Sequence, residues 1–180
     1  MNVGSREVWQ VAAGDTDRNY VDLLLEWDVI AMGPGWRGPW PDCKTALSND
    51  GWSEKKLADL KRFCEDLAEG DLIVLPLRTT DIYGVGEVVG NHPLWLDDFG
   101  DIDGWDLQHV RRVKWIWRHS GEPQQFPTHT MRWGDTVNRL RAEPALNWLR
   151  NLEYPQRNFL ATCELYLYLA RTRKQEARLA

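Results

Sequence analysis

The sequence predicts an α+β fold, in which a small curved mixed sheet or half-barrel is flanked by helices and followed by a C-terminal helical extension. Short apolar runs typical of strands are mixed with helix-like runs, without the regular strand–helix–strand order of a doubly wound sheet. The valine-rich run "IYGVGEVVG" at residues 82–90 also contains glycines, which allow a strand to bend or two backbones to approach closely.

The first third of the chain is expected to hold two short strands and one short helix. Residues 6–14 alternate polar and apolar side chains and end at a glycine, which is typical of a strand and its turn. Residues 15–28 place apolar side chains on one side of a short helix that an aspartate caps. The run "VIAMG" at 29–33 predicts a buried strand, and the Pro/Gly-rich residues 34–43 predict a loop.

The clearest helix is expected at residues 53–71, where Ser53 is a typical N-cap and Gly70 a typical stop signal. Its expected apolar face consists of Leu57, Leu60, Cys64 and Leu67. Beyond it we expect strands at 71–77 and 82–90, an acidic and aromatic loop at 91–106, and a strand at 109–118.

The C-terminal third is expected to be helical. Residues 119–129 have the composition of a linker, and helices are expected at 135–143, 144–153 and 155–179. We therefore expect a domain at residues 1–120 and a helical extension at 121–180 that packs on it.

The composition, 43% apolar and 27% charged, is that of a globular protein. No run approaches the roughly 18 uncharged apolar residues of a membrane span, so no membrane partner is expected. The N-terminus lacks the pattern of a signal peptide. Three widely spaced cysteines match neither a disulfide framework nor a zinc site, which favours a reducing compartment, and we expect the cytoplasm.

Charge is distributed unevenly along the chain. Residues 1–105 carry 9 basic and 20 acidic side chains, whereas residues 106–180 carry 13 and 7. A molecule polarised in this way can bind a polyanion with one face although its net charge is −5. A solvated helix surface is the alternative explanation of the basic half.

The strand expected at 109–118 combines cations with tryptophans. Alternation places one set of residues on one face, namely Arg111, Val113, Trp115 and Trp117. The other face carries Arg112, Lys114, Ile116 and Arg118. We expect the two tryptophans to pack inward and the exposed cations to form a row that can follow a phosphate backbone.

Tryptophan is unusually frequent, with 11 in 180 residues, and three of the indoles lie in expected loops. Trp36, Trp95 and Trp105 precede or follow strands, so they can converge at one end of the sheet and stack on a flat ligand. An aromatic box also favours an added methyl group, by about 0.8 kcal/mol. The alternative is that these indoles close the end of a barrel.

No catalytic constellation is apparent in the sequence. The glycines of "GVGEVVG" lie inside a strand and do not open a helix, which argues against a nucleotide-binding loop. The acidic residues of the 91–106 loop lack the spacing of a calcium-binding loop. We therefore expect no enzyme activity, no cofactor and no metal site.

Five segments together resemble a known family. The order "VWQVAAG", "VIAMGPGW", "EGDLIVLPL", "IYGVGEVVG" and "HVRRVKWIW" is similar to the EVE and YTH branches of the PUA-like superfamily. It most resembles the N-terminal specificity modules of modification-dependent restriction and antiphage systems. The similarity covers about residues 6–118.

This resemblance implies a reader of modified bases. By analogy with YTH-type readers, Trp36, Trp95 and Trp105 would form the aromatic cage, and a polar residue after the first strand would hydrogen-bond the base. Asp15, Asp17 and Asn19 lie in that region, and we expect Asp17 and Asn19 to bind the base. Arg37 stands where the YTH pattern has a small hydroxyl residue, and the family also accommodates modified cytosines, so the base stays open.

Two function classes follow. The first is a non-catalytic module that binds nucleic acid, DNA rather than RNA, and encloses a flipped, methylated base. Its expected contacts to the nucleic-acid backbone are Arg37, Arg111, Arg112, Lys114 and Arg118. The second is an interaction or assembly module of a larger defence or RNA-processing complex, which would dock a separate nuclease or NTPase effector through the helices at 155–180.

Overall fold

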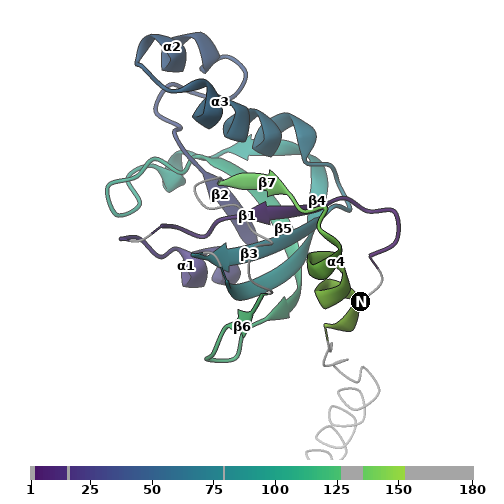
Figure 1. The fold of residues 1–180 in the computed structure, drawn as a ribbon. Coiled ribbons are helices and arrows are strands. Elements are labelled where there is room, and N and C mark those ends of the chain that lie inside the picture. The colour runs from purple at the N-terminus through teal and green to yellow at the C-terminus, as the bar shows by residue number, and fades with distance from the viewer. Residues whose placement is uncertain (1–2, 16, 79, 127–135, 153–180) are drawn as a thin grey trace, which may run out of the picture.

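The structure is a computed structural model that describes residues 3–15, 17–78, 80–126 and 136–152 of the 180-residue chain. These residues form one open, curved, seven-stranded sheet with four α-helices around it, which confirms the expected α+β class (Figure 1). The strands are β1 (Val8–Val11), β2 (Val29–Met32), β3 (Leu72–Leu77), β4 (Asp81–Trp95), β5 (His109–Arg118), β6 (Gln124–Gln125) and β7 (Val137–Arg139). The helices are α1 (Val21–Glu26), α2 (Lys44–Asn49), α3 (Glu54–Lys61) and α4 (Glu143–Asn151), with a π turn η1 (Arg62–Asp66) and a 3-10 turn η2 (Asp97–Phe99).

The sheet has the order β2-β5-β4-β3-β1-β7, and β6 pairs separately with β4. Only the β1–β3 pair is parallel among the described strands; the other pairs are antiparallel. The edge strands are therefore β2 at one side and β7 at the other.

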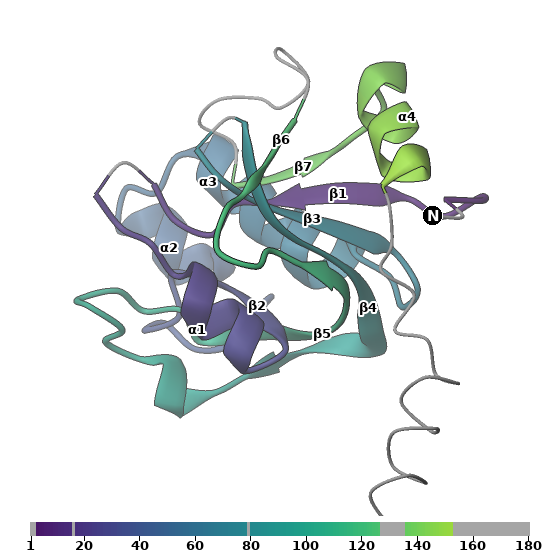
Figure 2. The same cartoon turned by 90° about the horizontal axis from the view of Figure 1, so that it is seen from below.

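Two apolar clusters cover the two faces of the sheet. Helices α1, α2 and α3 pack on one face, where Leu24 and Leu60 join Ile73 and Leu75 of β3. Helix α4 packs on the other face, where Leu149 joins a cluster that contains Leu72 and Val74 of the same strand. Because neighbouring residues of a strand point to opposite faces, α3 and α4 lie on opposite sides of the sheet (Figure 2).

The helix expected at 53–71 is shorter in the structure. It begins as expected, since Ser53 Oγ accepts a hydrogen bond from the backbone N–H of Lys56 at 3.4 Å. The α-helical part ends at Lys61, and η1 carries the chain to Asp66.

A β-bulge in β5 changes the expected faces of that strand. Trp115 pairs with Gly86 and Trp117 pairs with Val85, so Ile116 is the extra residue. Trp115 therefore packs with the first cluster and Trp117 with the second, and the prediction that both point to one face is wrong.

The glycines of β4 make room for Trp115. A Cβ atom on Gly86 would lie 2.3 Å from Val113 Cγ1 and 2.8 Å from Trp115 Cε3. A Cβ atom on Gly84 would lie 3.0 Å from Trp115 Cζ3. The glycines thus serve the close approach that their position inside a strand predicts.

The region after residue 118 departs most from expectation. Residues 137–139, expected in a helix, form β7 and pair with β1, and β6 lies in the expected linker. The sheet consequently continues past the expected domain boundary at residue 120. Helix α4 confirms the helix expected at 144–153, whereas the helix expected at 155–179 lies outside the described residues.

Among the helices that are described, none has the length and apolar character needed to cross a membrane.

Candidate functional site

A cavity of about 290 Å³ opens between the two edges of the curved sheet. Ala31 and Met32 of β2 line one side of it, and Thr136, directly before β7, lines another. The remaining lining residues are Ala12, Gly14, Asp15, Arg18, Tyr20, Leu24, Gly33, Trp52, Lys56, Asp59, Trp105 and Leu107. The sheet is not closed into a full barrel, and its open seam provides the space.

Two tryptophans form the aromatic walls of this cavity. Trp105, from the loop between β4 and β5, is 40% exposed, and Trp52, directly before the cap of α3, is partly buried. Trp36 contacts Trp52 edge-on, with ring centroids 5.8 Å apart, and is 48% exposed. Trp36 therefore extends the aromatic surface outside the cavity without lining it.

The third expected indole has a different role. The indole N–H of Trp95 donates a hydrogen bond to the Gly35 carbonyl at 3.1 Å, and Trp95 does not line the cavity. It thereby holds the loop that carries Trp36. The expected box of Trp36, Trp95 and Trp105 does not assemble, and Trp52 takes the place of the missing wall.

A cation lies over one face of each of these two indoles. The guanidinium carbon of Arg18 lies 3.6 Å from the ring centroid of Trp105, and Lys56 Nζ lies 4.8 Å from that of Trp52. Arg18 also forms an ion pair with Asp15, which lines the cavity. Both indoles are thus held by contacts to neighbouring elements.

The turn after β1 places only one of its polar residues at the cavity. Asp15 Oδ1 accepts the backbone N–H of Asp17 at 3.0 Å, and Asn19 Oδ1 accepts that of Val21 at 2.9 Å. Asp17 and Asn19 are exposed and do not line the cavity. Contrary to expectation, the Asn19 side chain holds the start of α1 and the Asp17 side chain lies outside the cavity, whereas Asp15 shapes the turn and faces the site.

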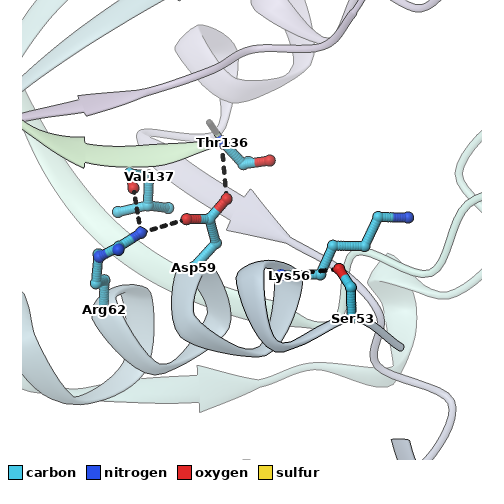
Figure 3. A network of polar contacts seen from close by, with 6 residues as sticks. All are labelled: Ser53, Lys56, Asp59, Arg62, Thr136 and Val137. Atoms are coloured by element: carbon cyan, nitrogen blue, oxygen red, sulfur yellow. Dashed lines mark hydrogen bonds and ion pairs between the residues drawn. The ribbon is translucent and has the colours of Figure 1, made fainter. Parts of the chain in front are cut away.

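Asp59 lines the cavity close to the start of β7. The carboxylate is buried and accepts hydrogen bonds from the backbone N–H of Thr136 at 3.0 Å and from Arg62 Nη1 (Figure 3). The same Arg62 nitrogen donates to the Val137 carbonyl at 3.3 Å (Figure 3). These contacts join α3 to the start of β7.

Tyr20 is a further polar group of the cavity. It is buried, and its hydroxyl has no hydrogen-bond partner among the described residues. Burial raises the pKa of Tyr20, and Arg18 partly opposes this effect. The hydroxyl is therefore neutral at physiological pH and can donate or accept one hydrogen bond.

Arg111, expected to contact phosphate, is a structural residue. It is fully buried, and its guanidinium donates to the carbonyls of Leu67 at 2.9 Å and Gly90 at 3.0 Å. Burial lowers the pKa of Arg111, while Cys64 and Asp71 act in the opposite direction. A phosphate outside the protein cannot reach this group, so the prediction that Arg111 contacts the nucleic-acid backbone is wrong.

The exposed cations of β5 line an open groove of about 530 Å³ beside β2. Arg112 and Lys114 are exposed and have no ion-pair partner in the described part of the chain, whereas Arg118 pairs with Asp28. Trp27, at 60% exposure, lines the same groove. We call this surface the β5 groove.

Arg37 lies outside both the cavity and the β5 groove. Its guanidinium forms two hydrogen bonds with Asp50, at 2.7 and 2.8 Å, and this contact raises the pKa of Arg37 and lowers that of Asp50. The pair fixes the loop next to Trp36.

Together these features define a small α+β domain with an aromatic cavity at the open seam of its sheet. Residues 9–141 match the family described as "Domain of unknown function (DUF8426)", and the chain belongs to this family. The matched segment runs from the second residue of β1 to just beyond β7, so it contains the described sheet except Val8 and all residues of the cavity. No curated protein matches the chain.

Proposed function

We propose that this domain is a non-catalytic nucleic-acid-binding module, PUA-like and similar to EVE and YTH domains, that holds one flipped, modified base in its cavity. The observation that carries the proposal is the pair of indoles, Trp52 and Trp105, that face one open cavity between the sheet edges. The proposal retains DNA as the preferred partner and the cytoplasm as the compartment.

The size of the cavity supports one flat base as its occupant. A volume of about 290 Å³ lies just below the range for small-molecule sites, about 300–1,000 Å³. Stacking on aromatic walls contributes about 1–3 kcal/mol per base. Base flipping costs a few kcal/mol, so two walls offset it and phosphate contacts add the remainder.

The charges around the cavity favour a neutral base over a methylated ammonium group. Arg18 and Lys56 already stand over the two indoles. Asp15 is paired with Arg18, and Asp59 with Arg62. A cationic ligand would meet the cations Arg18 and Lys56, while the two carboxylates of the cavity lining, Asp15 and Asp59, are already paired, which is unfavourable in a partly desolvated site.

The β5 groove supports a nucleic-acid partner. Arg112 and Lys114 supply two unpaired cations, and Trp27 offers an exposed face on which a second base can stack.

The effector-docking alternative rests on residues 155–180, which lie outside the described residues, and stays a prediction.

The proposal is tested by measuring binding of 13-nucleotide fluorescein-labelled single-stranded DNAs that are unmodified or carry one central N6-methyladenine or 5-methylcytosine. Trp105→Ala should weaken binding of the preferred modified strand by about 1–3 kcal/mol. Trp95→Ala, in a residue that does not line the cavity, is the matched control and should have a smaller effect. Equal affinity of the native chain for all three DNAs would contradict the proposal.

A further inference from the structure

A second open groove, of about 440 Å³, lies between η1 and β7. It is lined by Trp9, Arg62, Asp66, Asn138, Arg139 and Arg141. We call it the β7 groove. Neither the resemblance nor the cation row of β5 assigns any role to it.

The β7 groove adjoins the base cavity. Asp59 lines the cavity and Arg62 lines the groove, and these two side chains are hydrogen-bonded to each other (Figure 3). Thr136 of the cavity and Asn138 of the groove are two residues apart, or about 7 Å along an extended chain. A strand whose base enters the cavity can therefore place a neighbouring phosphate in the groove.

The arginines of this groove are held in place. The guanidinium carbon of Arg139 lies 4.6 Å from the ring centroid of Trp9, and its Nε forms an ion pair with Glu7 at 3.4 Å. Arg62 is fixed by Asp59 and by the Val137 carbonyl. A guanidinium has five N–H donors, so both side chains keep donors for an anion.

The charge balance of the β7 groove is positive. Asp66, the carboxylate in its lining, pairs with Lys61 at 3.0 Å. Arg141 is exposed and has no ion-pair partner among the described residues. It is the cation that a bound phosphate would neutralise without breaking an existing pair.

We propose that the β7 groove binds the sugar-phosphate backbone of the strand whose base occupies the cavity, with Arg141 as its main phosphate contact. This inference rests on the proposed function. It places backbone contacts on both sides of the cavity, since the β5 groove lies beside one edge strand and the β7 groove beside the other.

The test is the salt dependence of binding of the 13-nucleotide single-stranded DNAs to the full chain. Arg141→Gln should lower the slope of log K against log[KCl] by about 0.7, the value for one phosphate contact with a single strand. The ratio of affinities for modified and unmodified DNA should not change, and Arg141→Lys should restore the slope. Arg150→Gln removes the same charge from α4, on the opposite side of the sheet, and should leave the slope unchanged.

Three results would overturn the inference. If Arg141→Gln keeps the native slope while binding still depends on the modification, the groove is not a backbone site although the proposed function stands. If the native chain binds none of the DNAs, both the proposed function and this inference fail. Inorganic phosphate tests whether the groove is instead a site for free phosphate. The inference would also be overturned if phosphate, compared with chloride, raised the melting temperature of the native chain but not that of Arg141→Gln, while the substitution left DNA binding unaffected.

Discussion

Protonation of His109 is expected to weaken the fold in mild acid. The imidazole is buried, and its Nε2 accepts a hydrogen bond from the backbone N–H of Trp40 at 3.1 Å. Burial lowers the pKa of His109 from 6.5 to about 4, although the backbone at Met32 and Pro34 acts in the opposite direction. The folded protein therefore holds a neutral His109 that is an acceptor for the loop next to Trp36.

The two pKa values set the size of the effect. Between pH 6.5 and 4 the unfolded chain binds a proton at this histidine that the folded chain does not bind. The stabilising contribution is complete above pH 6.5 and is lost as the pH falls through this window. The free energy of unfolding should drop by about 2 kcal/mol at pH 5 and by about 3 kcal/mol at pH 4 from this residue alone.

Urea unfolding at pH 8 and pH 5, at constant ionic strength, measures this loss. His109→Gln keeps an acceptor for the Trp40 N–H but does not titrate, so the native chain should lose about 2 kcal/mol more than this variant. His92→Gln removes an exposed histidine and should behave like the native chain. Equal losses in the native chain and His109→Gln would refute the buried neutral imidazole.

Three further predictions concern packing and charge. Gly86→Ala should destabilise the fold by about 1–3 kcal/mol in urea unfolding because its Cβ atom would overlap Val113, whereas Val89→Ala at an exposed position of β4 should change stability little. Arg111→Met should lower the free energy of unfolding by about 2–3 kcal/mol without changing the salt slope of DNA binding. Arg112→Gln should lower the salt slope and leave the free energy of unfolding unchanged. Asp59→Asn should cost about 1.5–3 kcal/mol in thermal or urea unfolding because the contact to Arg62 loses its charge.

The sequence predicted the strands whose own residues are apolar. The runs that became β2 and β3 are buried along their whole length, so their composition alone marked them. Strand β7 has the sequence Val-Asn-Arg, which no strand pattern distinguishes from a helix, and it forms because β1 offers an unpaired edge. Such pairing is a tertiary effect that local residues do not encode.

The candidate site was predicted in part for similar reasons. Trp105 reaches the cavity and Trp36 lies at its margin, because indoles in loops near strand ends are available to a shared site. Trp52 was missed since it directly precedes the Ser53 cap, where an apolar residue usually only packs on its own helix. Arg111 shares the inward face with Val113, and this alternation was the signal that it is not a surface cation.

The most direct test of the cavity is a spectrum of the tryptophan indole N–H groups in 15N-labelled protein, titrated with N6-methyladenosine and with 5-methylcytidine. Individual Trp→Phe variants assign the signals. The account predicts that one of these nucleosides shifts the indole signals of Trp52 and Trp105 together and leaves that of Trp95 in place. Shifts confined to exposed indoles such as Trp27, or no saturable shift at Trp52 and Trp105 with either nucleoside, would contradict it.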